Sequence, residues 1–192
     1  MRGAQRRIGL VVAVLAFVAC SGRSGLVEQL DERAGMMVVR GREPLVFART
    51  EPRYSRSARD YLYLGPLATN RQGVREYYLW VGVGSTLDRG FIAPAAELPT
   101  RVYVTVAGEP MELALKPLTE LVRRTSTRPI YSTVVPLRAE LVARVTLQQL
   151  TLIDAESLQT LTVAADQGSQ RNYVRWENGS GFGDFVTGMA GR

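Results

Sequence analysis

"DYLYLGPLATNRQGVREYYLWVGVG", residues 60–84, is the stretch that decides the fold. Residues 61–64 and 76–83 are rich in aromatic and β-branched side chains, which favour β-strands. Gly65-Pro66 and residues 70–73 bound these runs and predict turns. The stretch therefore predicts two strands that pair, with the adjacent Tyr77 and Tyr78 on opposite faces.

Shorter runs on both sides of this stretch predict further antiparallel strands. In residues 111–115 apolar and polar side chains alternate, as expected for a strand with one buried face. Residues 49–60 are polar and rich in arginine, which predicts a surface loop. The expected strands and hairpins are 36–39 with 44–48 around "RGRE", 101–106 with 111–115 around "AGEP", 129–135 and 139–145 separately, and 157–165 with 171–176 across 166–169.

Two segments have helical rather than strand patterns. Thr146 followed by Gln149 has the spacing of a capping box and predicts a short helix. Phe182, Phe185, Val186 and Met189 fall at i, i+3, i+4 and i+7, and this predicts a helix that packs on the sheet. The expected fold class is α+β: an antiparallel β-rich single domain, residues 36–192, with a mid-chain helix and a C-terminal helix packed on the sheet.

The N-terminus carries a short apolar run, "RIGLVVAVLAFVAC", which ends at the only cysteine of the chain, Cys20. The run is shorter than the roughly 20 residues of a spanning helix. A basic stretch precedes it and the polar "SGRSG" follows, which is the layout of a secretory signal. "FVAC" resembles the lipobox of bacterial lipoproteins, although Phe17 stands where Leu is usual. The alternatives are a twin-arginine signal at Arg6-Arg7 and a buried cysteine after an uncleaved helix.

The lipobox resemblance implies a domain order and a location. Residues 1–19 are a cleaved signal peptide, and residues 20–35 are a lipidated N-terminus and flexible tether, with one helical turn at 26–30. Acylated Cys20 anchors the chain to a membrane by three acyl chains. Ser21, rather than Asp, implies the outer membrane of the bacterial cell envelope, with the domain facing the periplasm.

Composition excludes several classes of site. The expected signal carries three of the 24 basic residues and none of the 18 acidic ones, which leaves a charge of +3. No basic helix or basic aromatic stripe predicts nucleic-acid binding. The chain has no histidine, which excludes Ser-His-Asp and Cys-His catalysis and disfavours zinc. No P-loop surrounds Lys116, the only lysine. We expect no cofactor and no metal, and among catalytic groups only paired carboxylates remain.

Two clusters are candidates for binding. Aromatic residues of the two central strands could stack on sugars or receive a partner, or could form ordinary cross-strand packing: Tyr61, Tyr63, Tyr77, Tyr78 and Trp80. Arg53, Arg56 and Arg59 form a local basic cluster that could bind a partner's acidic strip or anionic headgroups, or be a solvated loop.

The sequence therefore predicts a non-catalytic, lipid-anchored periplasmic protein that binds or scaffolds another envelope protein. A small-ligand or glycan-binding lipoprotein that uses the tyrosine-rich hairpin is the second hypothesis, and a carboxylate-based hydrolase is the third. The sequence does not indicate an oligomeric state.

Overall fold

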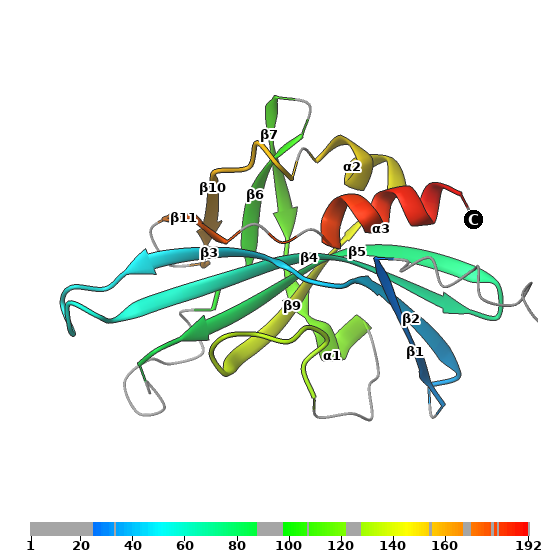
Figure 1. Ribbon diagram of the computed structural model, residues 1–192, viewed down its shortest axis with the longest axis horizontal. Helices are drawn as coiled ribbons and strands as arrows, with labels where there is room; N and C mark the ends of the chain where they lie inside the picture. Colours follow the sequence, from blue (N-terminus) through cyan, green and yellow to red (C-terminus); the bar gives the residue numbers. More distant parts are fainter. Residues whose placement is uncertain are drawn as a thin grey trace, which may run out of the picture.

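The computed structural model describes residues 25–32, 34–87, 98–106, 108–121, 128–153, 155–166, 170–177, 179 and 181–191. These residues form one antiparallel sheet of eleven strands and three short helices (Figure 1). The protein is thus mostly β, and the expected antiparallel, β-rich architecture is confirmed. The strands are β1 Leu26–Asp31, β2 Met36–Gly41, β3 Leu45–Thr50, β4 Arg59–Arg71, β5 Val74–Ser85, β6 Arg101–Val106, β7 Glu109–Ala114, β8 Lys116–Pro117, β9 Leu137–Val145, β10 Thr160–Ala164 and β11 Arg171–Glu177. The helices are α1 Leu118–Leu121, α2 Leu147–Leu152 and α3 Gly181–Ala190.

The hairpin of β4 and β5 is the centre of the sheet, as expected. The two strands pair from Asp60 with Ser85 to Arg71 with Val74. Gln72 and Gly73 join them in a two-residue turn, and both have positive φ angles, 52° and 86°. Positive φ at both positions is the requirement of the type I′ turns that suit the twist of a hairpin.

The turn expected at Gly65-Pro66 is wrong, because β4 continues through both residues. One edge of β4 pairs with β3 up to Leu64, and with β2 from Leu67 onward. Pro66 therefore lies between the two stretches, where that edge needs no N–H donor from it.

The expected hairpin of residues 36–39 and 44–48 is also wrong. Both segments are strands, β2 and β3, but they pair with the two halves of β4 rather than with each other. On its other side β2 pairs with β1, and β3 pairs with β11. A strand of 13 residues can hold two short partners end to end along one edge.

The sheet nearly closes on itself. Residues 109–117 pair first with β6, through β7, and then with β9, through β8. The order β6, β10, β11, β3, β4, β5, β9 completes the ring. The hairpins β6–β7 and β10–β11 are confirmed; residues 167–169 of the second turn lie outside the described residues.

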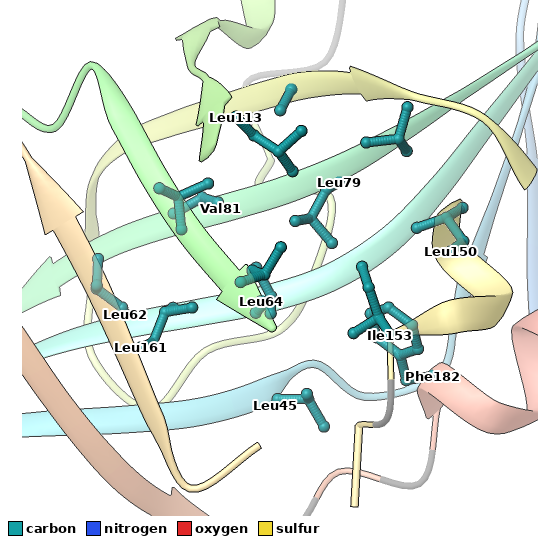
Figure 2. Close-up of a cluster of buried hydrophobic side chains, with 14 of the residues drawn as sticks. Leu45, Leu62, Leu64, Leu79, Val81, Leu113, Leu150, Ile153, Leu161 and Phe182 are labelled. Carbon is teal, nitrogen blue, oxygen red and sulfur yellow. The ribbon is translucent and has the colours of Figure 1, made fainter. Parts of the chain in front are cut away.

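Aliphatic side chains from alternate strand positions fill the inside of the ring. Figure 2 shows that Leu150 and Ile153, from the segment of α2, and Phe182 of α3 join the strand side chains at one end. Figure 1 shows α2 and α3 on the same side of β4 and β5, opposite α1. The labelled members of this interior core are Leu45, Leu62, Leu64, Leu79, Val81, Leu113, Leu150, Ile153, Leu161 and Phe182.

A second apolar cluster, the outer core, lies on the outside of the β2–β4–β5–β9 part of the sheet. The expected strand at residues 129–135 is wrong: this segment is irregular and packs over the outer face through Ile130 and Tyr131. Leu118 of α1 joins them. The expected strand at 139–145 is confirmed as part of β9.

Both expected helices are confirmed. In α2 the Thr146 hydroxyl accepts from Gln149 N at 3.1 Å, and Gln149 Oε1 accepts from Thr146 N at 2.8 Å, a complete capping box. In α3 the side chains of Phe182, Phe185 and Met189 are buried against the sheet.

The C-terminal part of the expected tether, residues 20–35, differs from the prediction. Residues 26–30 do not form a helical turn; they belong to β1, which pairs with β2 from Leu26–Gly41 to Asp31–Met36. The sheet thus reaches into the segment that was expected to be a tether. Cys20 and the whole expected signal lie outside the described residues.

Candidate functional site

Four of the five aromatic residues of the tyrosine-rich hairpin belong to a buried core. Tyr61, Tyr63, Tyr78 and Trp80 are all buried in the outer core. Tyr77 lies on the opposite face, half-buried against the interior core. Of the two alternatives for these aromatic residues, the structure agrees with ordinary packing, because Ile130 and Tyr131 pack over the outer face of β4 and β5.

The polar tips of the covered aromatic residues are bonded within the chain. Trp80 Nε1 donates to Glu140 Oε1 at 3.0 Å, and Ile130 N donates to the same oxygen at 2.8 Å. The Tyr131 hydroxyl donates to the Pro66 carbonyl, and the Tyr63 hydroxyl accepts from Val135 N. Burial raises the pKa of both tyrosines. These groups satisfy a buried cluster, as the packing alternative in the sequence implied.

The structure divides the basic cluster. Arg53 and Arg56 are exposed on the loop between β3 and β4, as expected for a surface loop. Arg59 begins β4 and turns to the outside of the sheet, where its guanidinium lies 4.5 Å from the centre of the Trp176 ring. Its Nε is buried and has no hydrogen-bond partner among the described residues. The position of Arg59 is thus set by stacking rather than by an ion pair.

Trp176 marks a surface that the sequence reasoning missed. It lies on the outer face of β11 with its side chain 48% exposed, two residues from Val174, which is 60% exposed. The rings of Trp176 and Tyr61 pack edge to face with their centres 6.5 Å apart, so that Trp176 contacts the outer core. We call Arg59, Val174 and Trp176 the Trp176 surface. Alternation within "RNYVRW" could have indicated it, because Tyr173 points to the interior core and so Val174 and Trp176 point outward.

The Arg175 side chain points to the opposite face of β11 from Trp176, and its role is structural. Its guanidinium lies 5.4 Å from the centre of the Phe47 ring and donates to the carbonyls of Ala155 and Leu158 at 3.0 and 3.2 Å. Burial lowers its pKa. Arg175 thereby holds the segment after α2 against β11.

An open groove of about 940 Å³ separates α2 from α3. Leu150, Ile153 and Phe182 lie beneath it and are almost completely buried, whereas Leu152 on its rim is 44% exposed. At the other end of the ring, the cavity beside the buried Asp60 holds only about 20 Å³. Since one water needs roughly 10–15 Å³, only the groove has room for a ligand of useful size among these two.

The groove does not favour carboxylate catalysis. Glu156 and Asp184 both line it, and both are exposed on its rim. A hydrolase of the paired-carboxylate type keeps one acid protonated in a sheltered, apolar position. Within the described part of the chain, no three His, Cys, Asp or Glu side chains gather as metal ligands.

Comparisons with known proteins give this chain no relatives on which to base a role. In the described ranges, no helix has the length and apolar character needed to cross a membrane. No family model, curated protein or solved structure matches the chain.

Proposed function

We propose that this protein is a lipid-anchored, non-catalytic component of the bacterial cell envelope that binds another envelope protein. The observation that carries this proposal is the Trp176 surface: a large aromatic ring left half-exposed on the outside of a domain whose interior is filled. A filled interior favours recognition on the outside of the sheet. Trp176 and Val174 lie two residues apart on the same face of β11, and exposed apolar side chains that adjoin one another favour a protein partner.

The anchor is supported by the lipobox resemblance at "FVAC" and by where the folded part begins. Since β1 starts at Leu26, only residues 21–25 separate Cys20 from the sheet. Five residues span at most about 17 Å when fully extended. An acylated Cys20 would therefore hold the domain close to the membrane surface, on the periplasmic side of the outer membrane that Ser21 implies.

The chemistry of the Trp176 surface indicates the kind of partner. Tryptophan and arginine are the residue types that dominate binding energy at protein interfaces. Arg59 stacks on Trp176, and Arg53 and Arg56 lie on the loop just before it. We therefore expect a protein partner that inserts an apolar side chain beside Trp176 and places acidic side chains against the arginines.

The test is purification of the tagged full-length protein from detergent-solubilised envelopes of its source cells. The intact mass reports whether Cys20 is acylated, and Cys20→Ala should lose that mass. Trp176→Ala should lose the co-purifying partner, while Leu30→Ala, at an exposed apolar residue on β1, should keep it. Higher salt should weaken the complex, because arginine–carboxylate attraction is screened.

The fluorescence of Trp80 reports whether the Trp176→Ala protein is folded, because Trp80 and Trp176 are the two tryptophans of the chain and Trp80 is fully buried. A stoichiometric partner that depends on Trp176 supports the proposal. A partner that remains bound to a folded Trp176→Ala protein would contradict the proposed surface. A chain without acyl mass would contradict the anchor.

A further inference from the structure

A small pocket lies on the outer face of the sheet, next to the Trp176 surface. It holds about 130 Å³, and Val46 and Tyr63 lie beneath it, almost completely buried. Its exposed walls come from three segments: the connection between β2 and β3, the segment of residues 128–136, and the end of β11. We call it the Glu177 pocket, and its exposed lining residues are Glu43, Ser132, Val134 and Glu177.

A bulge brings Trp176 and Glu177 to the same face of β11. Consecutive residues of a regular strand point to opposite faces. The pairing of β11 with β3 shifts its register between Arg175 and Glu177, so that Glu177 lies opposite Val46, a residue of the outer core. A shift of this kind inserts one extra residue and re-aims the side chains that follow it. The Glu177 pocket therefore continues the Trp176 surface along the outer face.

The acidic side chains of the pocket have no counter-charge from the described part of the chain. Within the described ranges, neither the Glu43 nor the Glu177 carboxylate forms an ion pair. Burial raises the pKa of Tyr63 most, and the charge of the nearby Glu177 raises it further. The backbone of Gly179 lies against the Pro44 carbonyl, which brings the end of β11 beside Glu43. Two acidic residues from distant segments thus meet at one small pocket.

The acceptor groups of the pocket suit a lysine ammonium group. An ammonium group has three donors that can point to different acceptors, whereas the planar fork of an arginine fits a single carboxylate best. The acceptors here belong to three segments, as the carboxylates of Glu43 and Glu177 and the hydroxyl of Ser132. Val134, with 69% exposure, offers an apolar surface to the methylene stem of a lysine.

We propose that the Glu177 pocket takes a lysine side chain of the protein that binds at the Trp176 surface. This inference rests on the proposed function, because the lysine belongs to that partner. Along β4, Tyr63 beneath the pocket is four residues from Arg59, a separation of about 13 Å. The partner therefore places its lysine on one side of Trp176 and its acidic side chains on the other. Opposite charges at the two ends fix the direction in which the partner lies on the sheet.

Carbodiimide cross-linking of the purified complex tests this inference, because the reagent joins a carboxylate to an amine that it contacts. The tagged full-length protein is purified with its partner, treated with carbodiimide and digested, and the joined peptides are identified by mass spectrometry. We expect a link from Glu177 or Glu43 to a lysine of the partner. Lys116 is the only lysine of this chain, so a link to any other lysine comes from the partner.

A matched pair of variants measures what the contact contributes. Glu177→Gln should abolish the link at position 177 and raise the Kd for the purified partner about two- to fivefold, as expected for an exposed ion pair. Glu109→Gln, at an exposed glutamate at the start of β7, is the control and should change neither the link nor the Kd.

The outcomes separate this inference from the proposed function. A partner that depends on Trp176 but gives no link to Glu177 or Glu43 overturns the lysine contact and leaves the proposed function standing. The same holds for a link with an unchanged Kd in Glu177→Gln, since the pocket would then contribute nothing to binding. A link from Glu177 to Lys116 also overturns the inference, because the pocket would hold a lysine of this chain. A protein without any partner overturns both.

Discussion

The interior core and the outer core are built from the same strands by different means. The interior core is mostly aliphatic, and strands on all sides of the ring supply it. The outer core is rich in aromatic residues, and one irregular segment, residues 128–136, covers much of it. The first core needs only apolar residues at every second strand position. The second also needs a cover that fits.

The difference teaches where this protein uses hydrogen bonds to stabilise packing. Ring strands satisfy their own backbone groups, whereas an irregular cover must find partners for its N–H groups elsewhere. Glu140 accepts from Ile130 N and the Tyr63 hydroxyl accepts from Val135 N. Tyrosine and tryptophan therefore suit the outer core, because each combines an apolar ring with a polar group that can bond to the cover. Their presence there does not indicate a ligand.

The largest effect is expected inside the ring. Phe47 is fully buried in the interior core beneath Arg175, so Phe47→Ala should lower the free energy of unfolding by about 3–5 kcal/mol. Urea denaturation followed by Trp80 fluorescence measures this change. A loss below about 1 kcal/mol would show that the interior is not packed as described.

A smaller effect is expected where the cover meets the sheet. The missing side chain of Gly65 makes room for Tyr131, whose Cζ would lie 2.6 Å from a Cβ at position 65. Gly65→Ala should therefore cost about 1–3 kcal/mol by overpacking. Gly183→Ala, in an exposed helical position with no atom within 4 Å of the new Cβ, is the matched control and should stabilise α3 by up to about 1 kcal/mol. If both changes were neutral, Tyr131 would not be seated on Gly65.

The smallest effect is expected at one hydrogen bond of the outer core, and it depends on pH. Tyr131→Phe removes the donor to the Pro66 carbonyl and should cost about 0.5–1.5 kcal/mol at neutral pH. Burial raises the pKa of Tyr131 above its ordinary value of 10.0, so the folded protein holds this proton more firmly than the unfolded chain. Its contribution is complete below pH 10 and declines as the pH rises above that value.

Urea midpoints at about pH 8 and about pH 11 test this sign. The wild-type protein should lose more stability across this interval than Tyr131→Phe, which has no hydroxyl to ionise. Tyr54→Phe, in the exposed loop, should behave like wild type. Equal slopes for wild type and Tyr131→Phe would mean that the Tyr131 hydroxyl is not buried.

Local patterns in the sequence were sufficient to predict several helices and strands. The Thr146 and Gln149 pair predicted α2, and the spacing from Phe182 to Met189 predicted α3. Alternation predicted the half-buried face of β7, where Leu113 is buried and Glu112 is exposed. Each of these depends on residues a few positions apart, which one element brings together without help from the rest of the chain.

Local patterns did not predict which strands pair with each other or which segment covers a face of the sheet. Residues 36–39 and 44–48 look like a hairpin, but each pairs with a different half of β4. Residues 129–135 have the composition of a strand, yet they lie across the sheet as a cover. Residues 26–30 look like part of a tether and form β1. In the first two cases a distant surface offered more burial than the nearest segment of the sequence, whereas β1 pairs with β2, the next strand along the chain.

For the central hairpin, for β7 and for α3, the sequence by itself determined the type of element and which side chains share a face, because the period of an element is a local property of the backbone. It also carries the lipobox-like pattern on which the proposed anchor rests. Only the tertiary structure decided which face meets water. Residues 128–136 cover Trp80 and Tyr63 through Tyr131 and Val135, whereas Trp176 on β11 stays half-exposed, because burial depends on what packs above a face.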